Sequence, residues 1–98
     1  MADVIATIPK KLYRSGEVTG FTGISRQTLH YYNQIGLIQE AEKTQSGQRL
    51  YHEDVFIVIE KIKDYQRQKL TLVEIRDKLR TDAQLKFHFY DTAGNELR

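Results

Sequence analysis

Apolar residues recur at helical spacing in the second half of the chain, which predicts two amphipathic helices there. The first begins near His52, and Glu53 and Asp54 lie in its first turn, where the helix dipole favours negative charge. The second follows Thr71, which has the spacing of a capping box with Glu74. The residues expected to face the core are Val55, Val58, Ile59, Ile62 and Tyr65 in the first helix and Leu72, Ile75 and Leu79 in the second.

Capping residues predict two shorter helices in the first half of the chain. Ser15 is placed to cap a helix over residues 16–22, which Gly23 can end by adopting a positive φ. Ser25 is placed to cap the next helix, which Gly36 ends. The intervening turn of about three residues is typical of a helix-turn-helix. Apolar residues at helical spacing in the second of these helices are Leu29, Tyr32 and Ile35.

Two segments have the features of strands. Residues 40–47 are polar and rich in turn formers, so we expect a hairpin with its tip at residues 44–47 and a return strand at residues 48–51. Residues 83–90 alternate, which predicts a C-terminal strand, and the last three residues look too short to pair well. One face of that strand would carry Leu85, Phe87 and Phe89, and the other Lys86, His88 and Tyr90. The expected fold is mainly α, a winged helix-turn-helix with a small β-hairpin wing and a C-terminal strand.

Composition narrows the class of protein. A chain of 98 residues with 40% hydrophobic residues can bury one modest core. The absence of Cys excludes disulfides and thiolate metal sites, and it fits a reducing cytoplasm. No apolar run approaches the length of a membrane segment. The His residues are far apart in sequence, and no catalytic arrangement or phosphate-binding Gly-rich loop is present, so we expect no enzyme, no metal and no cofactor.

Charge is informative by its distribution. The formal net charge is only +2, from 15 basic and 13 acidic residues. If these charges were spread evenly over the surface, the protein would attract a polyanion only weakly, but residues 10–49 are enriched in basic residues. The charged residues there are Lys10, Lys11, Arg14, Arg26, Lys43 and Arg49 against Glu17, Glu40 and Glu42.

A series of short motifs follows one another over roughly residues 12–80: Gly16-Glu17-Val18, Gly23-Ile24-Ser25, Thr28-Leu29, Tyr31-Tyr32, Ile35-Gly36-Leu37, Gly47-x-Arg49-x-Tyr51 and Leu72-x-Glu74-Ile75. In order and spacing these motifs resemble the DNA-binding domain of the MerR family. The resemblance implies a bacterial winged-helix transcription factor that binds operators within promoters, in the cytoplasm at the nucleoid. We divide the chain into a flexible arm at residues 1–11, this domain at residues 12–80, and a C-terminal strand and tail at residues 81–98.

The helix predicted after Ser25 is the candidate for recognising the DNA sequence. Near its beginning it presents Arg26, Gln27, Thr28 and His30, whose side chains could reach base edges in a major groove, although any solvated helix face looks similar. Family members often have Arg in place of His30, so we expect weaker and more pH-sensitive binding here. Adjacent Tyr31 and Tyr32 point about 100° apart. We assign Tyr32 to the core and, as the family implies, Tyr31 to a DNA phosphate.

The wing and the turn before the last predicted helix are candidates for contact with the DNA backbone. Gln48 and Arg49 follow Gly47 on the return strand and could reach phosphates beside the groove. Tyr51 and Lys69 are weaker candidates, and Lys69 precedes the last helix, where the family forms a second wing. Lys43 is also a weaker candidate, for which a solvated charge is the better interpretation.

Several alternatives stay open from the sequence. The chain could be an excisionase-like or architectural DNA-binding protein, or a winged-helix module for protein–protein interaction. The family usually continues into a long helix that pairs two protomers in an antiparallel coiled coil, whereas only 19 residues follow Leu79 here. We therefore expect either a small stand-alone protein, which is monomeric or a homodimer through the C-terminal segment, or the front part of a longer chain.

Overall fold

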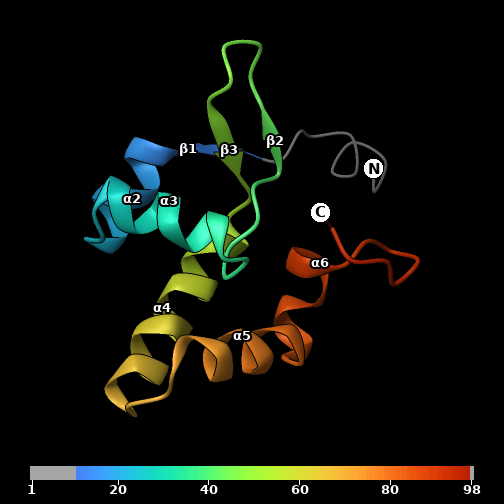
Figure 1. Ribbon diagram of the computed structural model, residues 1–98. Coiled ribbons are helices and arrows are strands. Elements are labelled where there is room, and N and C mark those ends of the chain that lie inside the picture. The colour runs from blue at the N-terminus through green and yellow to red at the C-terminus, as the bar shows by residue number, and fades with distance from the viewer. Residues whose placement is uncertain (1–10, 98) are drawn as a thin grey trace, which may run out of the picture.

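The computed structural model describes residues 11–97, and the predicted helix-turn-helix lies in its N-terminal half (Figure 1). It consists of α2 (Ser15–Thr22) and α3 (Arg26–Gln34). Gly23 ends α2 with a φ of 80°, and Ser25 caps α3 by accepting the Thr28 N–H at 3.0 Å. Ser15, expected as a cap, is instead the first residue of α2. The arm expected at residues 1–11 lies outside the described residues, apart from Lys11.

A small antiparallel sheet holds the hairpin. It contains β1 (Tyr13–Arg14), β2 (Glu42–Lys43) and β3 (Arg49–Tyr51) in the order β1-β3-β2. The hairpin turns at residues 44–47 as predicted, where Gly47, with a φ of 87°, donates its N–H to the Thr44 carbonyl at 2.9 Å. The first strand, β1, lies within residues 10–14, which the sequence predicts to be a short extended stretch without a pairing partner. Its two residues pair with β3, so the segment before α2 is fixed beside the wing.

Both long helices predicted in the second half are present. They are α4 (Asp54–Arg67) and α5 (Leu72–Arg80). The capping box at the start of α5 forms, with Thr71 Oγ1 accepting the Glu74 N–H at 3.2 Å and Glu74 Oε1 accepting the Thr71 N–H at 2.9 Å. In the turn before it, Lys69 has a φ of 67°, which is unusual for a residue with a side chain.

The C-terminal strand predicted at residues 83–90 is wrong, because this segment is helical. It forms η1 (Ala83–Leu85) and α6 (Lys86–Phe89), and Asp82 Oδ1 accepts the Gln84 N–H at 2.9 Å to start it. Leu85 and Phe89 are four residues apart and both buried, whereas Phe87, expected beside them, is 63% exposed. The alternating pattern of the sequence therefore concealed the pair Leu85 and Phe89, which lie four residues apart on one face of a helical turn.

The end of the chain is also better paired than expected. Tyr90 forms an isolated β-bridge with Glu96, and the Leu97 N–H donates to the Phe89 carbonyl at 2.8 Å. The Arg80 guanidinium donates to Glu96 at 2.7 Å and to the Gly36 carbonyl at 3.1 Å, which attaches this end to the loop after α3.

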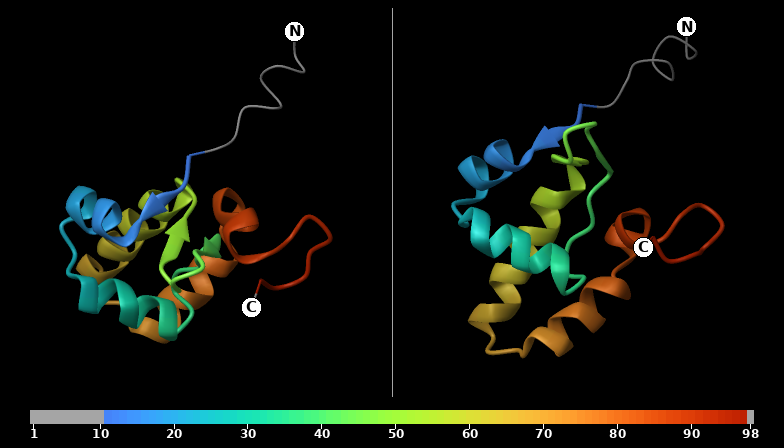
Figure 2. Two further views of the ribbon diagram at one scale, coloured as in Figure 1. Left: turned by 90° about the horizontal axis from the view of Figure 1, so that it is seen from above. Right: turned by 45° about the horizontal axis from the view of Figure 1, so that its top comes forward.

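One core joins all these elements. In Figure 2, α2 and α3 lie against one side of α4, and α5 turns back toward α6. Within residues 11–97, no helix is both long and apolar enough to cross a membrane. The buried hydrophobic residues are Val18, Leu29, Tyr32, Leu37, Ile38, Tyr51, Val55, Val58, Ile59, Ile62, Ile75, Leu79, Leu85 and Phe89.

Candidate nucleic-acid interface

Helix α3 has one buried face and one exposed polar face. Leu29 and Tyr32 enter the core, as predicted, and the Tyr32 hydroxyl accepts a hydrogen bond from Gln66 Nε2 at 3.1 Å. Because α3 has a cap at Ser25 and rests on this apolar stripe, its first turns are held firmly. The polar residues that the sequence singled out on the helix are exposed or, for Thr28, half-buried: Arg26, Gln27, Thr28 and His30.

The hairpin is attached to this polar face through Arg49. Its Nη1 lies 3.0 Å from His30 Nδ1, and its Nε lies 2.6 Å from Glu40 Oε2. A guanidinium can only donate, so His30 Nδ1 is the acceptor in this contact. The structure therefore joins helix and wing into one surface.

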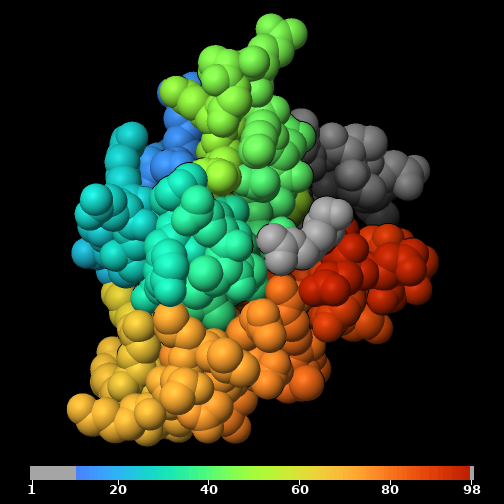
Figure 3. Space-filling view, in the orientation of Figure 1, coloured from blue at the N-terminus to red at the C-terminus, as the bar shows by residue number. Residues whose placement is uncertain are grey.

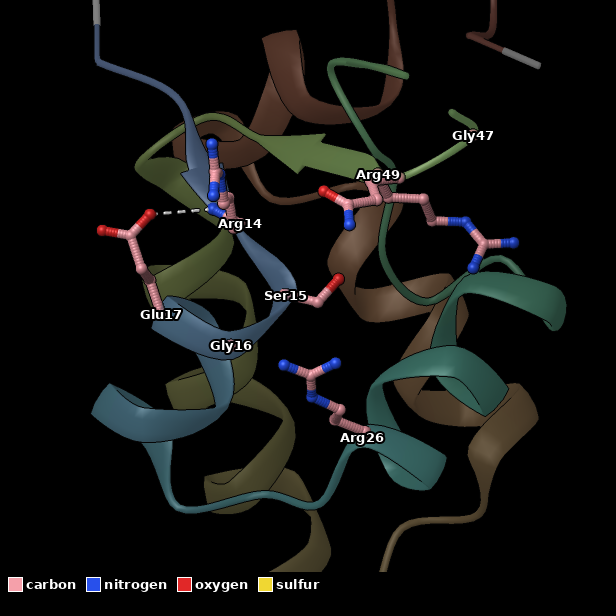
Figure 4. A pocket seen from close by; sticks show the side chains of 8 residues that line it. Arg14, Ser15, Gly16, Glu17, Arg26, Gly47 and Arg49 are labelled. Atoms are coloured by element: carbon pink, nitrogen blue, oxygen red, sulfur yellow. Dashed lines mark hydrogen bonds between the residues drawn. The ribbon is translucent and has the colours of Figure 1, made fainter. Parts of the chain in front are cut away.

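A groove of about 500 Å³ runs between the start of α2, the start of α3 and the wing. Figure 4 shows Arg26 rising from α3 toward Ser15 and Gly16, with Arg14 and Arg49 on the strands above. Sequence reasoning missed Arg14 as a member of this surface. The signal was the basic run that it ends, but only the pairing of β1 with β3 brings it to the groove. The lining residues are Arg14, Ser15, Gly16, Glu17, Arg26, Gly47, Gln48 and Arg49.

Glu17 contributes little negative charge to the inside of this groove, because its carboxylate is occupied elsewhere. Its Oε1 accepts the Arg14 backbone N–H at 3.0 Å, and its Oε2 lies 3.3 Å from Lys11 Nζ. The Arg14 N–H and Lys11 hold the pKa of Glu17 below its usual range. In Figure 4 the carboxylate lies on the outer side of α2, away from Arg26.

Tyr51 does not lie on the exposed surface. Its side chain is 1% exposed, its hydroxyl donates to Asn33 Oδ1 at 2.6 Å, and burial raises its pKa. A side chain this buried offers almost no surface to DNA, so the interface proposed below omits Tyr51. In a strand, alternate side chains face opposite sides, so Tyr51 and Arg49 share a side, but the strand ends against the core at Tyr51.

The elements that carry the remaining candidates lie along one face of the molecule. In Figure 3 the hairpin, α3 and the turn between α4 and α5 lie one below another. Gln48 and Lys43 are exposed on the hairpin, and Lys69 is exposed in that turn. Tyr31 is 47% exposed and lines a separate groove between α3 and α5 with Val73 and other residues. The structure thus places every candidate except Tyr51 on the surface, and it brings Arg26, Gln48 and Arg49 together.

Residues 11–97 contain no group of three or more His, Cys, Asp or Glu side chains placed to hold a metal ion. His88 is buried, but it has structural partners: Nε2 accepts the Gln39 N–H at 2.9 Å, and Nδ1 lies 3.1 Å from Asp54 Oδ1.

Several known proteins are similar to this chain in sequence and in fold. Residues 14–51 match the model of the MerR family regulatory protein. The chain is 39% identical over 67 residues to the mercuric resistance operon regulatory protein of Bacillus cereus, covering 68% of this chain and 50% of that protein. It is 34% identical over 71 residues to nodulation protein NolA of Bradyrhizobium sp. (strain NC92), covering 72% of this chain and 30% of NolA.

Among solved structures, the chain resembles the N-terminus of MtaN, the Bacillus subtilis multidrug transporter activator. The TM-score is 0.66 and the identity 28%, over 72% of this chain and 67% of that one. The described residues thus reproduce a known arrangement of helices and wing, and the chain spans half or less of the two curated relatives.

Proposed function

This chain belongs to the MerR family, and from that premise we propose that it binds double-stranded DNA at promoters as a transcriptional regulator. The observation that carries the proposal is the Arg49–His30 contact of 3.0 Å, which joins the wing to the polar face of α3. A major groove of B-DNA, about 12 Å wide, admits one α-helix. With α3 in it, the hairpin would lie over the adjacent backbone.

The proposed interface assigns two kinds of contact. Gln27, Thr28 and His30 would face base edges, where amide, hydroxyl and imidazole groups can discriminate between base pairs. Backbone contacts would set register and make binding weaken with salt. With Tyr51 removed and Arg14 added, the full set is Arg14, Arg26, Gln27, Thr28, His30, Tyr31, Gln48, Arg49 and Lys69.

The first test measures binding of the purified chain to random duplex DNA across a salt series, followed by selection of the tightest sequences. We expect salt-dependent binding and enrichment of a defined sequence. The double charge reversal Arg26→Glu with Arg49→Glu should abolish binding. Lys86→Glu, on α6, reverses one charge outside the groove and serves as the control. Salt-independent or undetectable binding by the unaltered chain would refute the proposal and favour a protein-interaction module.

Two copies would be needed to read an inverted repeat, because two-fold symmetry in an operator mirrors that of the protein. We propose a homodimer on DNA, but not through an edge strand at residues 85–90, since residues 86–89 are helical. Mass in solution and on the selected duplex tests this proposal. We also propose that the chain acts in the cytoplasm at the nucleoid and has no catalytic activity. The name of the Bacillus cereus relative supports the regulatory role alone.

A further inference from the structure

The groove beside α2 is lined by two arginines, Arg14 and Arg26, that form no ion pair with a carboxylate among residues 11–97. The charge of Arg14 acts on Glu17 only from a distance and is a minor cause of its lowered pKa. The third arginine, Arg49, is paired with Glu40 at 2.6 Å. Glu17, which also lines the groove, is held on Lys11 and on the Arg14 backbone. Gathered like charges repel, so this groove is suited to an anion.

The position of Arg26 indicates whether its side chain would contact a DNA phosphate or a base edge. A methyl group added to Gly16 would lie 2.9 Å from Nη2 of Arg26, so the guanidinium rests over the first turn of α2. Figure 4 shows the same direction, with the Arg26 side chain extending toward Ser15 and Gly16. An arginine that reads a guanine must instead extend away from the protein toward the base edge. Arg26 is therefore directed to the side of α3, where a DNA strand would pass between helix and wing.

We propose that Arg14 and Arg26 together bind one phosphate of the DNA backbone, and that Gly16 permits this by leaving space for the Arg26 guanidinium. The inference rests on the proposed DNA binding and deepens it. Arg26 then sets affinity and register, whereas the choice of sequence falls to other residues of α3. Arg14, outside the helix-turn-helix, becomes a DNA ligand.

The first experiment compares Arg14→Ala, Arg26→Ala and the double variant with the unaltered chain on its selected duplex across a salt series. Each single change should weaken binding about tenfold, as expected for loss of a charged hydrogen bond. The slope of log affinity against log salt should become shallower by up to about 0.9, the value for one phosphate. Because both residues hold the same phosphate, the double variant should lose less than the product of the two single losses. A double loss equal to that product would overturn the shared site.

The second experiment repeats the sequence selection with Arg26→Ala. We expect the same preferred sequence as for the unaltered chain, bound more weakly. Relaxed preference at one base pair, with an unchanged salt slope, would make Arg26 a base reader and overturn the inference while leaving the proposed function intact. Failure of the unaltered chain to bind DNA would instead refute the proposed function itself.

Gly16→Ala tests the space that Arg26 occupies. Alanine is the better helix former by about 1 kcal/mol, and the displaced atom is the end of a flexible side chain, so the fold should be kept. Affinity should fall in the unaltered chain but not further in the Arg26→Ala background. An equal loss in both backgrounds would contradict the assigned role of Gly16. Lys86→Ala, which removes one charge from α6, should leave affinity within about twofold.

Discussion

At the scale of single residues, burial decides what the Tyr51 side chain does. Its hydroxyl donates to Asn33 Oδ1 at 2.6 Å from a nearly closed environment. Tyr51→Phe should lower the free energy of unfolding by about 1 kcal/mol, because Asn33 loses its donor. DNA affinity should stay unchanged. Urea denaturation and a binding titration of the same preparation check both, and a large loss of affinity with intact stability would contradict this assignment.

The same residue gives an alkaline prediction. Burial raises the pKa of Tyr51, so the folded protein keeps the phenol proton to higher pH than the unfolded chain does. Its stabilising contribution is complete below about pH 10, the pKa of an unfolded tyrosine, and is lost as pH rises through the folded value. The phenylalanine variant should therefore lose stability less steeply above about pH 10.

His30 holds the wing beside α3 through its contact with Arg49. At the proposed interface, His30→Arg replaces the imidazole by a guanidinium, which carries a permanent positive charge and more hydrogen-bond donors. This variant should therefore bind the selected duplex more tightly, and its affinity should fall more steeply with salt. A binding titration of both chains across a salt series measures the difference. Equal affinities would contradict the assignment of His30 to the interface.

At the scale of elements, Lys69 separates stability from binding in the turn before α5. Its φ of 67° is a left-handed conformation, which costs about 1 kcal/mol for a residue with a side chain. Lys69→Gly should raise the free energy of unfolding by up to that amount and weaken DNA binding, since a charge is removed from the proposed interface. Thermal unfolding and a salt titration measure the two effects. Unchanged affinity would remove Lys69 from the interface.

Asp82 connects the C-terminal segment to α4 and gives an acid-dependent prediction. Lys61 Nζ, at 2.5 Å, and the Gln84 N–H lower the pKa of Asp82. A lowered pKa means that the stabilisation is present above the unfolded value near 4 and is lost as pH falls through the folded one. Asp82→Asn should cost about 1 kcal/mol at neutral pH and less at about pH 3, as measured by urea midpoints. An equal loss at both pH values would contradict the ion pair.

The elements also show which patterns in the sequence were decisive. The cap at Ser25, the stop at Gly23 and the turn at Gly47 act locally, and each is present in the structure. The prediction of a strand at residues 83–90 was wrong because alternation over a few residues cannot distinguish a strand from one helical turn that carries Leu85 and Phe89. The groove depends on long-range pairing: β1 meets β3, so Arg14 could not be placed from local spacing.

At the scale of the whole molecule, the C-terminal segment belongs to the core. Leu85 and Phe89 are each 1% exposed within the hydrophobic cluster, and Arg80 bonds to the Gly36 carbonyl. A chain ending at residue 80 should lose about 3 kcal/mol or more of unfolding free energy, from the two buried side chains alone. Phe89→Ala should reproduce part of the loss. Urea midpoints measure both, and a truncated chain of undiminished stability would make residues 81–97 a separate appendage.

The buried His88 also forms a hydrogen bond with a residue outside its own helix. It accepts the N–H of Gln39, a residue outside regular secondary structure on the path from α3 to the wing. That amide hydrogen should exchange with deuterium far more slowly than its loop neighbours, because solvent reaches it only when α6 separates from the core. The exchange rate of this single amide proton therefore measures how often α6 detaches from the loop at the base of the wing.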